Sequence, residues 1–109
     1  MTKYEARTLS AESNGRVAKG DCVCLSVTTA EPFMVRKILT IPMGPKTQIL
    51  RISANGFEVS FRPHTGDLLL PLPLVPANGL VEVVLANNGE PAVMKVGVTG
   101  LVAVNDEQA

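Results

Sequence analysis

The 109-residue chain has ten Lys and Arg side chains and ten Asp and Glu side chains, so its formal net charge is zero. An apolar fraction of 46% with only 18% charged residues excludes an intrinsically disordered chain, which is poor in apolar and rich in charged residues. The length suits one domain, and the lack of a basic excess disfavours binding to nucleic-acid phosphates.

Residues 1 to 20 are polar and follow neither the helical nor the strand period. They predict a polar N-terminal arm, either a frayed terminus or a segment that orders only against a neighbouring subunit. Arg7 and Arg16 are its candidate contact residues. The first residues lack an apolar run, so no secretory signal is expected.

The segment from Asp21 to Thr29 alternates in the manner of a strand with one buried face, which carries Val23, Leu25 and Val27. Cys22 and Cys24 fall on the opposite face. Two residues along a strand are roughly 7 Å apart, whereas disulfide Cβ atoms approach to about 3.8 Å. Free thiols in a reducing compartment are therefore expected.

A second strand is predicted from Phe33 to Ile41. Phe33, Val35, Leu39 and Ile41 would share its buried face. Lys37 interrupts this stripe, which indicates either a solvated end or a bulge.

Asn55-Gly56 lies between two alternating runs and predicts a hairpin with a type I′ turn. The turn sets a register that aligns six apolar residues on one face, in the pairs Ala54 with Phe57, Ile52 with Val59 and Leu50 with Phe61. The opposite face would pair Ser53 with Glu58, Arg51 with Ser60 and Ile49 with Arg62. A slip of one residue would expose the apolar side chains, so pattern and turn agree.

His64 to Asp67 reads as a turn, and a leucine–proline segment follows it from Leu68 to Pro76. Its prolines exclude a helix and a central strand and favour polyproline II or a sheet edge. Leaving its leucines in water would cost up to roughly 2 kcal/mol each, so the segment either covers the core or contacts another chain. The candidate contact residues are Leu68, Leu69, Leu70, Leu72 and Leu74.

A second hairpin is predicted around Asn88-Gly89, between strands at 80–86 and 92–104. In this register Glu82 would lie opposite Lys95, an attractive cross-strand pair. Gly97 and Gly100 would permit a bend or bulge in the last strand.

These elements predict an all-β fold, a single antiparallel β-sandwich of jelly-roll type with about six to eight strands and no significant helix. We expect a polar arm at residues 1–20, a β-sandwich domain at 21–105 and a polar tail at 106–109. The longest apolar run is too short to span a membrane.

No catalytic, cofactor-binding or metal-binding constellation stands out. His64 lies beside a predicted turn, and a nucleophilic pair or a zinc site with Cys22 and Cys24 lacks the usual spacing and a fourth ligand. No glycine-rich phosphate loop precedes a helix. We therefore expect a protein that is not an enzyme, with no cofactor, metal or small-molecule substrate.

The run from Leu80 to Val104, LVEVVLANNGEPAVMKVGVTGLVAV, resembles the closing hairpin of small β-sandwich and single jelly-roll proteins of virus particles. Phages use such domains as penton, minor capsid or decoration proteins. The resemblance implies a structural role, symmetric self-association and no cofactor.

Two hypotheses follow. The first is a virion component, made in the host cytoplasm, that binds copies of itself and other capsid proteins through sheet edges, the arm and the leucine–proline segment. The alternative is a soluble, cytoplasmic β-sandwich adaptor or ligand-binding module of a larger cellular complex.

Overall fold

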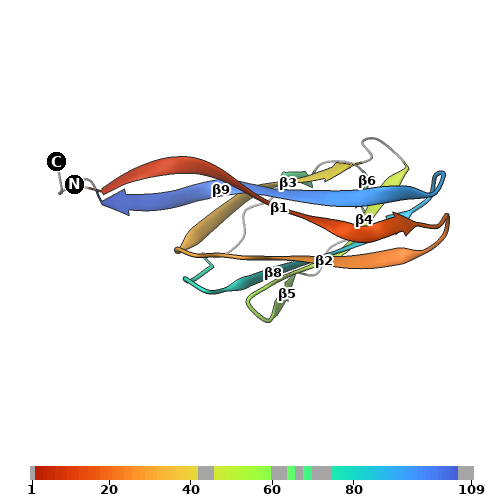
Figure 1. Cartoon of the computed structure of the whole chain (residues 1–109). Helices are drawn as coiled ribbons and strands as arrows, with labels where there is room; N and C mark the ends of the chain where they lie inside the picture. Colours follow the sequence, from red (N-terminus) through yellow and green to blue (C-terminus); the bar gives the residue numbers. More distant parts are fainter. Residues whose placement is uncertain (1, 42–45, 60–63, 66–67, 70–74, 106–109) are drawn as a thin grey trace.

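The computed structural model describes residues 2–41, 46–59, 64–65, 68–69 and 75–105. Within these ranges the chain forms nine β-strands, and it contains no helix long and apolar enough to cross a membrane (Figure 1). The strands in chain order are β1 (Thr2–Val17), β2 (Cys22–Thr28), β3 (Phe33–Ile41), β4 (Thr47–Ala54), β5 (Phe57–Val59), β6 (His64–Thr65), β7 (Leu68–Leu69), β8 (Leu80–Asn87) and β9 (Ala92–Asn105).

The strands form two antiparallel sheets that lie as two layers (Figure 1). The first sheet has the order β1-β9-β3-β7, and the second has the order β2-β8-β4-β5, with β6 also paired to β4. The three strands β5, β6 and β7 have only two or three residues each, which leaves six long strands. The prediction of an all-β antiparallel sandwich is confirmed.

Strand pairing is nested about the middle of the chain. β4 pairs with β5, β3 with β7, β2 with β8 and β1 with β9, so each strand of the first half lies beside a counterpart in the second half. The innermost pair is joined by the Asn55-Gly56 turn, and the outermost pair is the longest. The hairpin predicted from Asn55-Gly56 is thus the strand pair at the centre of the nested series.

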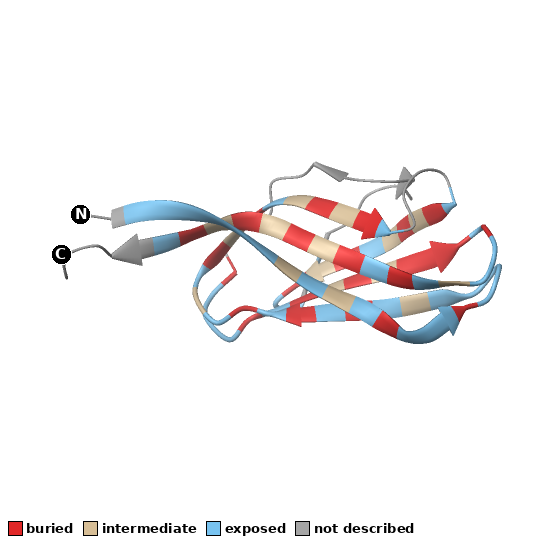
Figure 2. Cartoon of the chain, turned by 45° about the horizontal axis from the view of Figure 1, so that its top comes forward, coloured by how far each residue is buried: buried red, intermediate tan, exposed pale blue. Residues whose placement is uncertain are grey.

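The core lies between the two sheets. Buried and exposed residues alternate along the long strands, because successive side chains of a strand point to opposite faces (Figure 2). The largest fully buried side chains are Phe33, Ile38, Ile49, Ile52, Leu85 and Met94. In β2 the inward residues are Leu25 and Val27, as predicted, and both cysteines are exposed.

The Asn55-Gly56 turn is confirmed. Asn55 has φ 50° and Gly56 has φ 88°, the positive values that a type I′ turn requires at both central positions. The three residue pairs between β4 and β5, among them Ser53 with Glu58, have the predicted register.

Farther from the turn, β4 departs from the prediction. A bulge between Ile49 and Arg51 in the pairing with β8 adds a residue to β4. Ile49 is therefore fully buried on the same side as Ile52, whereas Leu50, predicted for the core, is only half-buried. Strict alternation places Ile49 on the polar face, and the added residue reverses that placement.

The predicted turn at His64 begins instead with the short strand β6. Ile49 pairs with His64, not with Arg62 as predicted. Residues 60–63 and 66–67 lie outside the described part of the chain. Phe61 is among them, so its predicted core position remains a prediction.

A bulge also interrupts β3, between Val35 and Lys37 in the pairing with β9. The predicted bulge is confirmed, and it changes which residues point inward. Val35 and Ile38 are fully buried, whereas Leu39 is half-buried and Ile41 is 51% exposed. The predicted core placement of Leu39 and Ile41 was wrong, because the bulge moves both to the outer face.

The predicted hairpin around Asn88-Gly89 was wrong, because β8 and β9 belong to different sheets. Neither residue has the positive φ of a type I′ turn. The buried side chain of Asn87 organises the crossing instead. Its Nδ2 donates to the carbonyls of Val17 at 2.7 Å and Glu90 at 3.0 Å, and its Oδ1 accepts from the Gly89 N–H at 2.9 Å.

The predicted pairing of Glu82 with Lys95 fails for the same reason. Glu82 of β8 lies opposite Ser53 of β4, and Lys95 of β9 lies opposite Glu12 of β1. The opposite charges of Glu82 and Lys95 were therefore no evidence for a hairpin between these strands.

The N-terminal segment is not an arm. Thr2–Val17 forms β1, which pairs with β9 along its length and belongs to the sandwich that was predicted to begin at Asp21. The segment shows no strand period because both of its faces are exposed from Lys3 to Thr8. The predicted tail at 106–109 lies outside the described residues.

Candidate interaction site

The edge of β1 is the longest open edge in the described part of the chain. β1 has 16 residues, pairs with β9 on one side and has no ladder partner on the other. A strand of this length, at about 3.3 Å per residue, matches the 50 Å long axis of the molecule. At the end near the termini, β1 and β9 project beyond β2, β3 and β8 (Figure 1).

The hydrogen bonds of β3 show which β1 groups face this edge. The Phe33 N–H donates to the Val75 carbonyl at 2.7 Å, and the Val75 N–H donates back at 2.8 Å, so the polar backbone of Phe33 points away from β9. Antiparallel pairs alternate between bonded and non-bonded. Phe33 and Val102 of β9 are therefore a non-bonded pair, and the N–H and C=O of Val102 point away from β3. They bond instead to Glu5 of β1, the residue that pairs with Val102 on the other side of β9. The flanking Ala6 consequently directs its N–H and C=O outward.

The far end of β1 agrees with this assignment. The Met94 N–H of β9 donates to Ser13 Oγ of β1 at 3.0 Å, so Met94 also faces β1. The ladder from Thr2 to Glu12 is regular. Even-numbered residues of β1 from Thr2 to Ser10 therefore direct their N–H and C=O groups outward, where no described strand pairs with them.

A bulge interrupts the β1 edge at one end only. A bulge between Glu12 and Arg16 disrupts the ladder, with Ser13 buried, its Oγ donating to the Gly15 carbonyl at 2.6 Å, and Gly15 at φ 94°. Bulges and prolines are common means of blocking sheet edges against pairing with other chains. The stretch Thr2–Ser10 contains neither.

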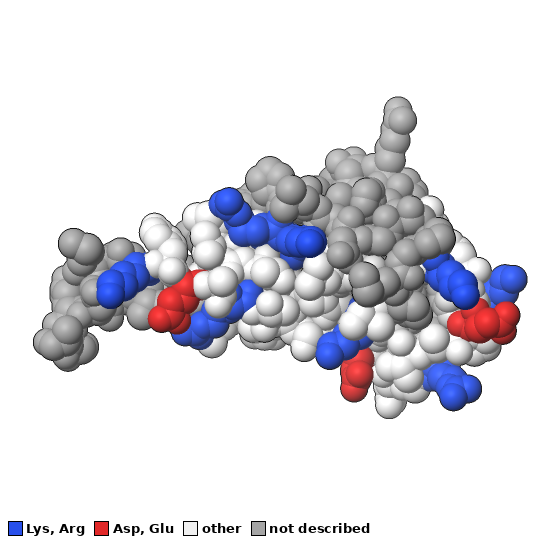
Figure 3. Space-filling model, turned by 90° about the horizontal axis from the view of Figure 1, so that it is seen from above, with Lys and Arg blue, Asp and Glu red and all other residues white. Residues whose placement is uncertain are grey.

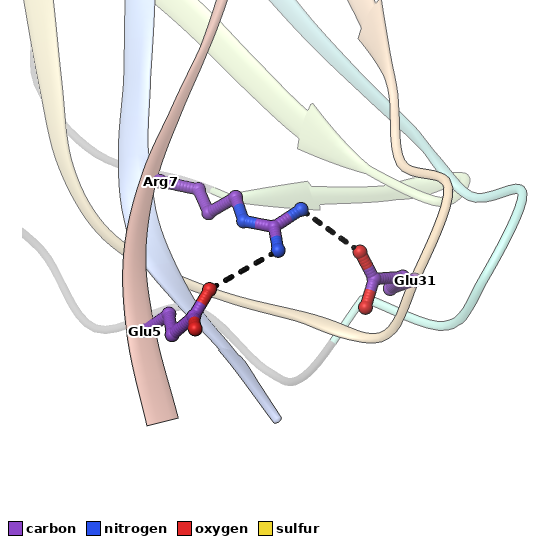
Figure 4. A network of polar contacts seen from close by, with 3 residues as sticks. All are labelled: Glu5, Arg7 and Glu31. Carbon is purple, nitrogen blue, oxygen red and sulfur yellow. Dashed lines mark hydrogen bonds and ion pairs between the residues drawn. The ribbon is translucent and has the colours of Figure 1, made fainter. Parts of the chain in front are cut away.

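The exposed stretch carries charges of alternating sign. Lys3, Glu5 and Arg7 share one face, because they are two residues apart. Arg7 bridges two carboxylates, with Nη2 at 3.2 Å from Glu5 Oε2 and Nη1 at 3.0 Å from Glu31 Oε1 in the loop after β2 (Figure 4). These side chains remain 41% to 55% exposed, so each pair stabilises the fold by about 1 kcal/mol at most.

The other face of the same stretch is nearly uncharged. Tyr4, Ala6 and Thr8 of β1 pair with Ala103, Leu101 and Thr99 of β9 and lie on the outside of the first sheet. Tyr4 is 61% exposed. In the view from above, positive and negative side chains are interspersed among uncharged surface, without a field of one sign (Figure 3).

The structure separates the predicted contact residues. Arg7 lies on the exposed edge, and the exposed Arg16 lies beyond the bulge, opposite Val93. Leu68 and Leu69 form β7, paired with Ile38 and Lys37 at the other edge of the first sheet. Leu70, Leu72 and Leu74 lie outside the described residues.

The sequence prediction missed most of the β1 edge, and one signal could have indicated it. Lys3, Glu5 and Arg7 alternate with the uncharged Tyr4 and Ala6. Charge, and not hydrophobicity, therefore repeats here every two residues, which is the period of a strand.

Cys22 and Cys24 are free, exposed thiols on β2. Cys24 Sγ donates to Glu82 Oε2 of β8 at 3.8 Å. Partial burial, and then the charge and the hydrogen bond of Glu82, raise the pKa of the Cys24 thiol, and the Arg51 guanidinium opposes this rise. Among the described residues, no three His, Cys, Asp or Glu side chains gather closely enough to hold a metal ion.

Neither a protein-family model, nor a curated protein, nor a solved structure matches this chain.

Proposed function

We propose that this chain is a non-enzymatic structural protein that assembles with copies of itself through the open edge of β1. The observation that carries the proposal is the stretch Thr2–Ser10, whose outward N–H and C=O groups have no partner within the described residues. An exposed edge of this length is a template for a strand of another chain.

A virus particle is the setting we propose for this assembly. The nested pairing of β1 with β9, β2 with β8, β3 with β7 and β4 with β5 supports a jelly-roll assignment, since a jelly roll is a sandwich of two Greek keys and is common in viral capsid proteins. Fold alone does not give function, so the proposal rests on the edge, and the jelly roll supplies the context.

The mass of the purified chain tests the proposal. Light scattering coupled to size-exclusion chromatography should give a discrete oligomer at micromolar concentrations, and the oligomer should dissociate on dilution. A monomer up to millimolar concentration would overturn self-assembly and favour the adaptor alternative.

A further inference from the structure

We propose that two copies of the chain pair antiparallel along β1 about a two-fold axis at Ala6. This inference rests on the proposed function and specifies the contact between copies. It places Ala6 opposite Ala6 of the second copy, Tyr4 opposite Thr8 and Glu5 opposite Arg7. The result is a continuous eight-stranded sheet, with β1 and its copy at the centre.

Backbone geometry limits the possible registers. The outward N–H and C=O groups belong to even-numbered residues, so an even-numbered residue of one copy must face an even-numbered residue of the other. Every two-fold axis that lies on a residue of β1 meets this condition, so the backbone alone does not choose among the registers.

Charge favours two of these registers. An axis at Glu5 sets Glu5 against its own copy and Lys3 against Arg7, and an axis at Arg7 sets Arg7 against its own copy. Like charges directly opposite one another on neighbouring strands are destabilising. An axis at Ala6 instead pairs Glu5 with Arg7 twice, once on each side of the axis. An axis at Tyr4 pairs Glu5 with Lys3. Axes from Thr8 to Ser10 give no pair of opposite charges before the bulge, so charge does not favour them.

Length decides between the two that remain. An axis at Ala6 pairs Thr2–Ser10 with itself and allows five bonded residue pairs, which is about ten backbone hydrogen bonds at two per pair. An axis at Tyr4 pairs only Thr2–Ala6 among the described residues and allows about six. The Ala6 register also ends before the bulge at Ser13, so both strands stay regular over the full contact.

The paired stretch of each copy carries Lys3, Glu5 and Arg7, a net charge of +1, and Glu31, which is bound to Arg7, brings this sum to zero. Glu5 and Arg7 of opposite copies would meet at a non-bonded pair, where side chains approach most closely. The small Ala6 leaves room for Tyr4 to pack across the strand against Thr8 of the other copy.

A cysteine at the axis tests the register directly. Ala6→Cys in a Cys22→Ser, Cys24→Ser background should form a disulfide dimer on mild oxidation, because Cα atoms in a bonded pair are about 5.5 Å apart, within the disulfide range. Tyr4→Cys in the same background is the matched control, since its copies would lie about 13 Å apart along the strand. Cross-linking at Tyr4 but not at Ala6 would overturn the register.

Ala6→Pro provides a second test on the intact chain. Proline removes only the outward N–H of Ala6 and leaves the bonds between β1 and β9 in place. The dissociation constant of the Ala6→Pro dimer should be at least tenfold higher than that of the Ala6→Ser dimer. The circular dichroism spectra of the two variants should be the same, which shows that the fold is intact.

The outcomes separate the two proposals. A monomeric natural chain overturns both. An oligomer that survives Ala6→Pro and gives no disulfide at Ala6 overturns this contact and leaves self-assembly standing.

Discussion

Asn87 is a buried polar residue that directs the chain from one sheet to the other. Its amide makes hydrogen bonds with Val17, Glu90 and Gly89 at 2.7 to 3.0 Å, so it joins the end of β1 to the crossing between β8 and β9. The same position in a tight hairpin would need no such network. The side chain therefore ties the end of β1 to the segment in which the chain passes from β8 to β9.

Replacing Asn87 with Ala should destabilise the fold by roughly 2–4 kcal/mol, because three hydrogen bonds are lost and buried backbone groups are left without partners. Urea unfolding followed by circular dichroism measures the change. Asn88→Ala is the matched control at the exposed neighbouring position and should change the stability by less than about 0.5 kcal/mol. Equal effects of the two substitutions would contradict the role of the buried amide.

The Cys24 thiol offers a second prediction at the scale of a single residue. Because Glu82 raises the pKa of Cys24, Glu82→Gln should lower that pKa and increase the thiolate fraction at pH 8. In a Cys22→Ser background, alkylation by iodoacetamide should then be about two- to fivefold faster, since burial still holds the pKa above its ordinary value.

Arg51 supplies the opposite control, because its charge lowers the pKa of Cys24. Arg51→Gln should slow alkylation under the same conditions. If both variants shift the rate in the same direction, exposure of the thiol and not charge controls its reactivity.

At the scale of the strand, β9 contains two glycines with different surroundings. A Cβ on Gly100 would overlap the Met34 carbonyl and reach 2.5 Å from the Phe33 ring, whereas a Cβ on Gly97 would lie 3.5 Å from Thr8 Cγ2. Gly100 therefore allows β3 to lie close to β9, beside the bulge between Val35 and Lys37.

Gly100→Ala should destabilise the fold by about 2–3 kcal/mol, because backbone atoms on β3 must move to accommodate the methyl group. Gly97→Ala should be neutral or slightly stabilising, since the contact is an ordinary one and alanine reduces the freedom of the unfolded chain. Thermal unfolding of the two variants should rank Gly97→Ala well above Gly100→Ala. The reverse order would contradict the close approach.

Local elements were predictable, and elements that depend on distant parts of the chain were not. The Asn55-Gly56 hairpin needs only its own turn and alternation, so the sequence indicates both its position and its register. Asn88-Gly89 is the same dipeptide as Asn55-Gly56 and also favours a tight turn. Here Asn87 instead makes a hydrogen bond with Val17, a residue distant in the sequence. Nothing within the segment from Leu80 to Ala92 reveals that contact.

The bulges and the edge limited the prediction in a different way. One added residue in β4 brings Ile49 into the core, and one in β3 turns Leu39 outward, because a shift of one residue reverses the face of all that follow. β1 was missed because hydrophobic periodicity reports burial, and the stretch from Lys3 to Thr8 is exposed on both faces.

At the scale of the whole molecule, the nested pairing places the last strand β9 beside the first strand β1. β1 is thereby held along one side, while its other side becomes an edge of the sandwich. The charge pattern of that edge can be tested with two variants, each of which should dimerise more weakly alone than the natural chain, whereas their mixture should associate.

In a dimer of the Glu5→Arg variant, the new arginine would face Arg7 of the second copy with a like charge. In a dimer of the Arg7→Glu variant, the new glutamate would face Glu5 in the same way. Each variant alone should lose roughly 1–4 kcal/mol of dimerisation free energy, since two attractive pairs become two repulsive ones. A mixture restores both attractive pairs, because each of the two arginines in one variant then faces a glutamate of the other. The mixture should therefore form a heterodimer in sedimentation experiments.

Salt provides the control for the charge exchange. At about 1 M NaCl the screening length falls to about 3 Å, so the two variants and the natural chain should converge in affinity. The intrachain contacts of Arg7 with Glu5 and Glu31 are exposed and contribute about 1 kcal/mol each at most, so the fold of each variant should lose no more than about 2 kcal/mol. Homodimers of either variant as strong as those of the natural chain would exclude the contact between Glu5 and Arg7. Failure of the mixture to associate, with the natural chain dimeric, would exclude it equally.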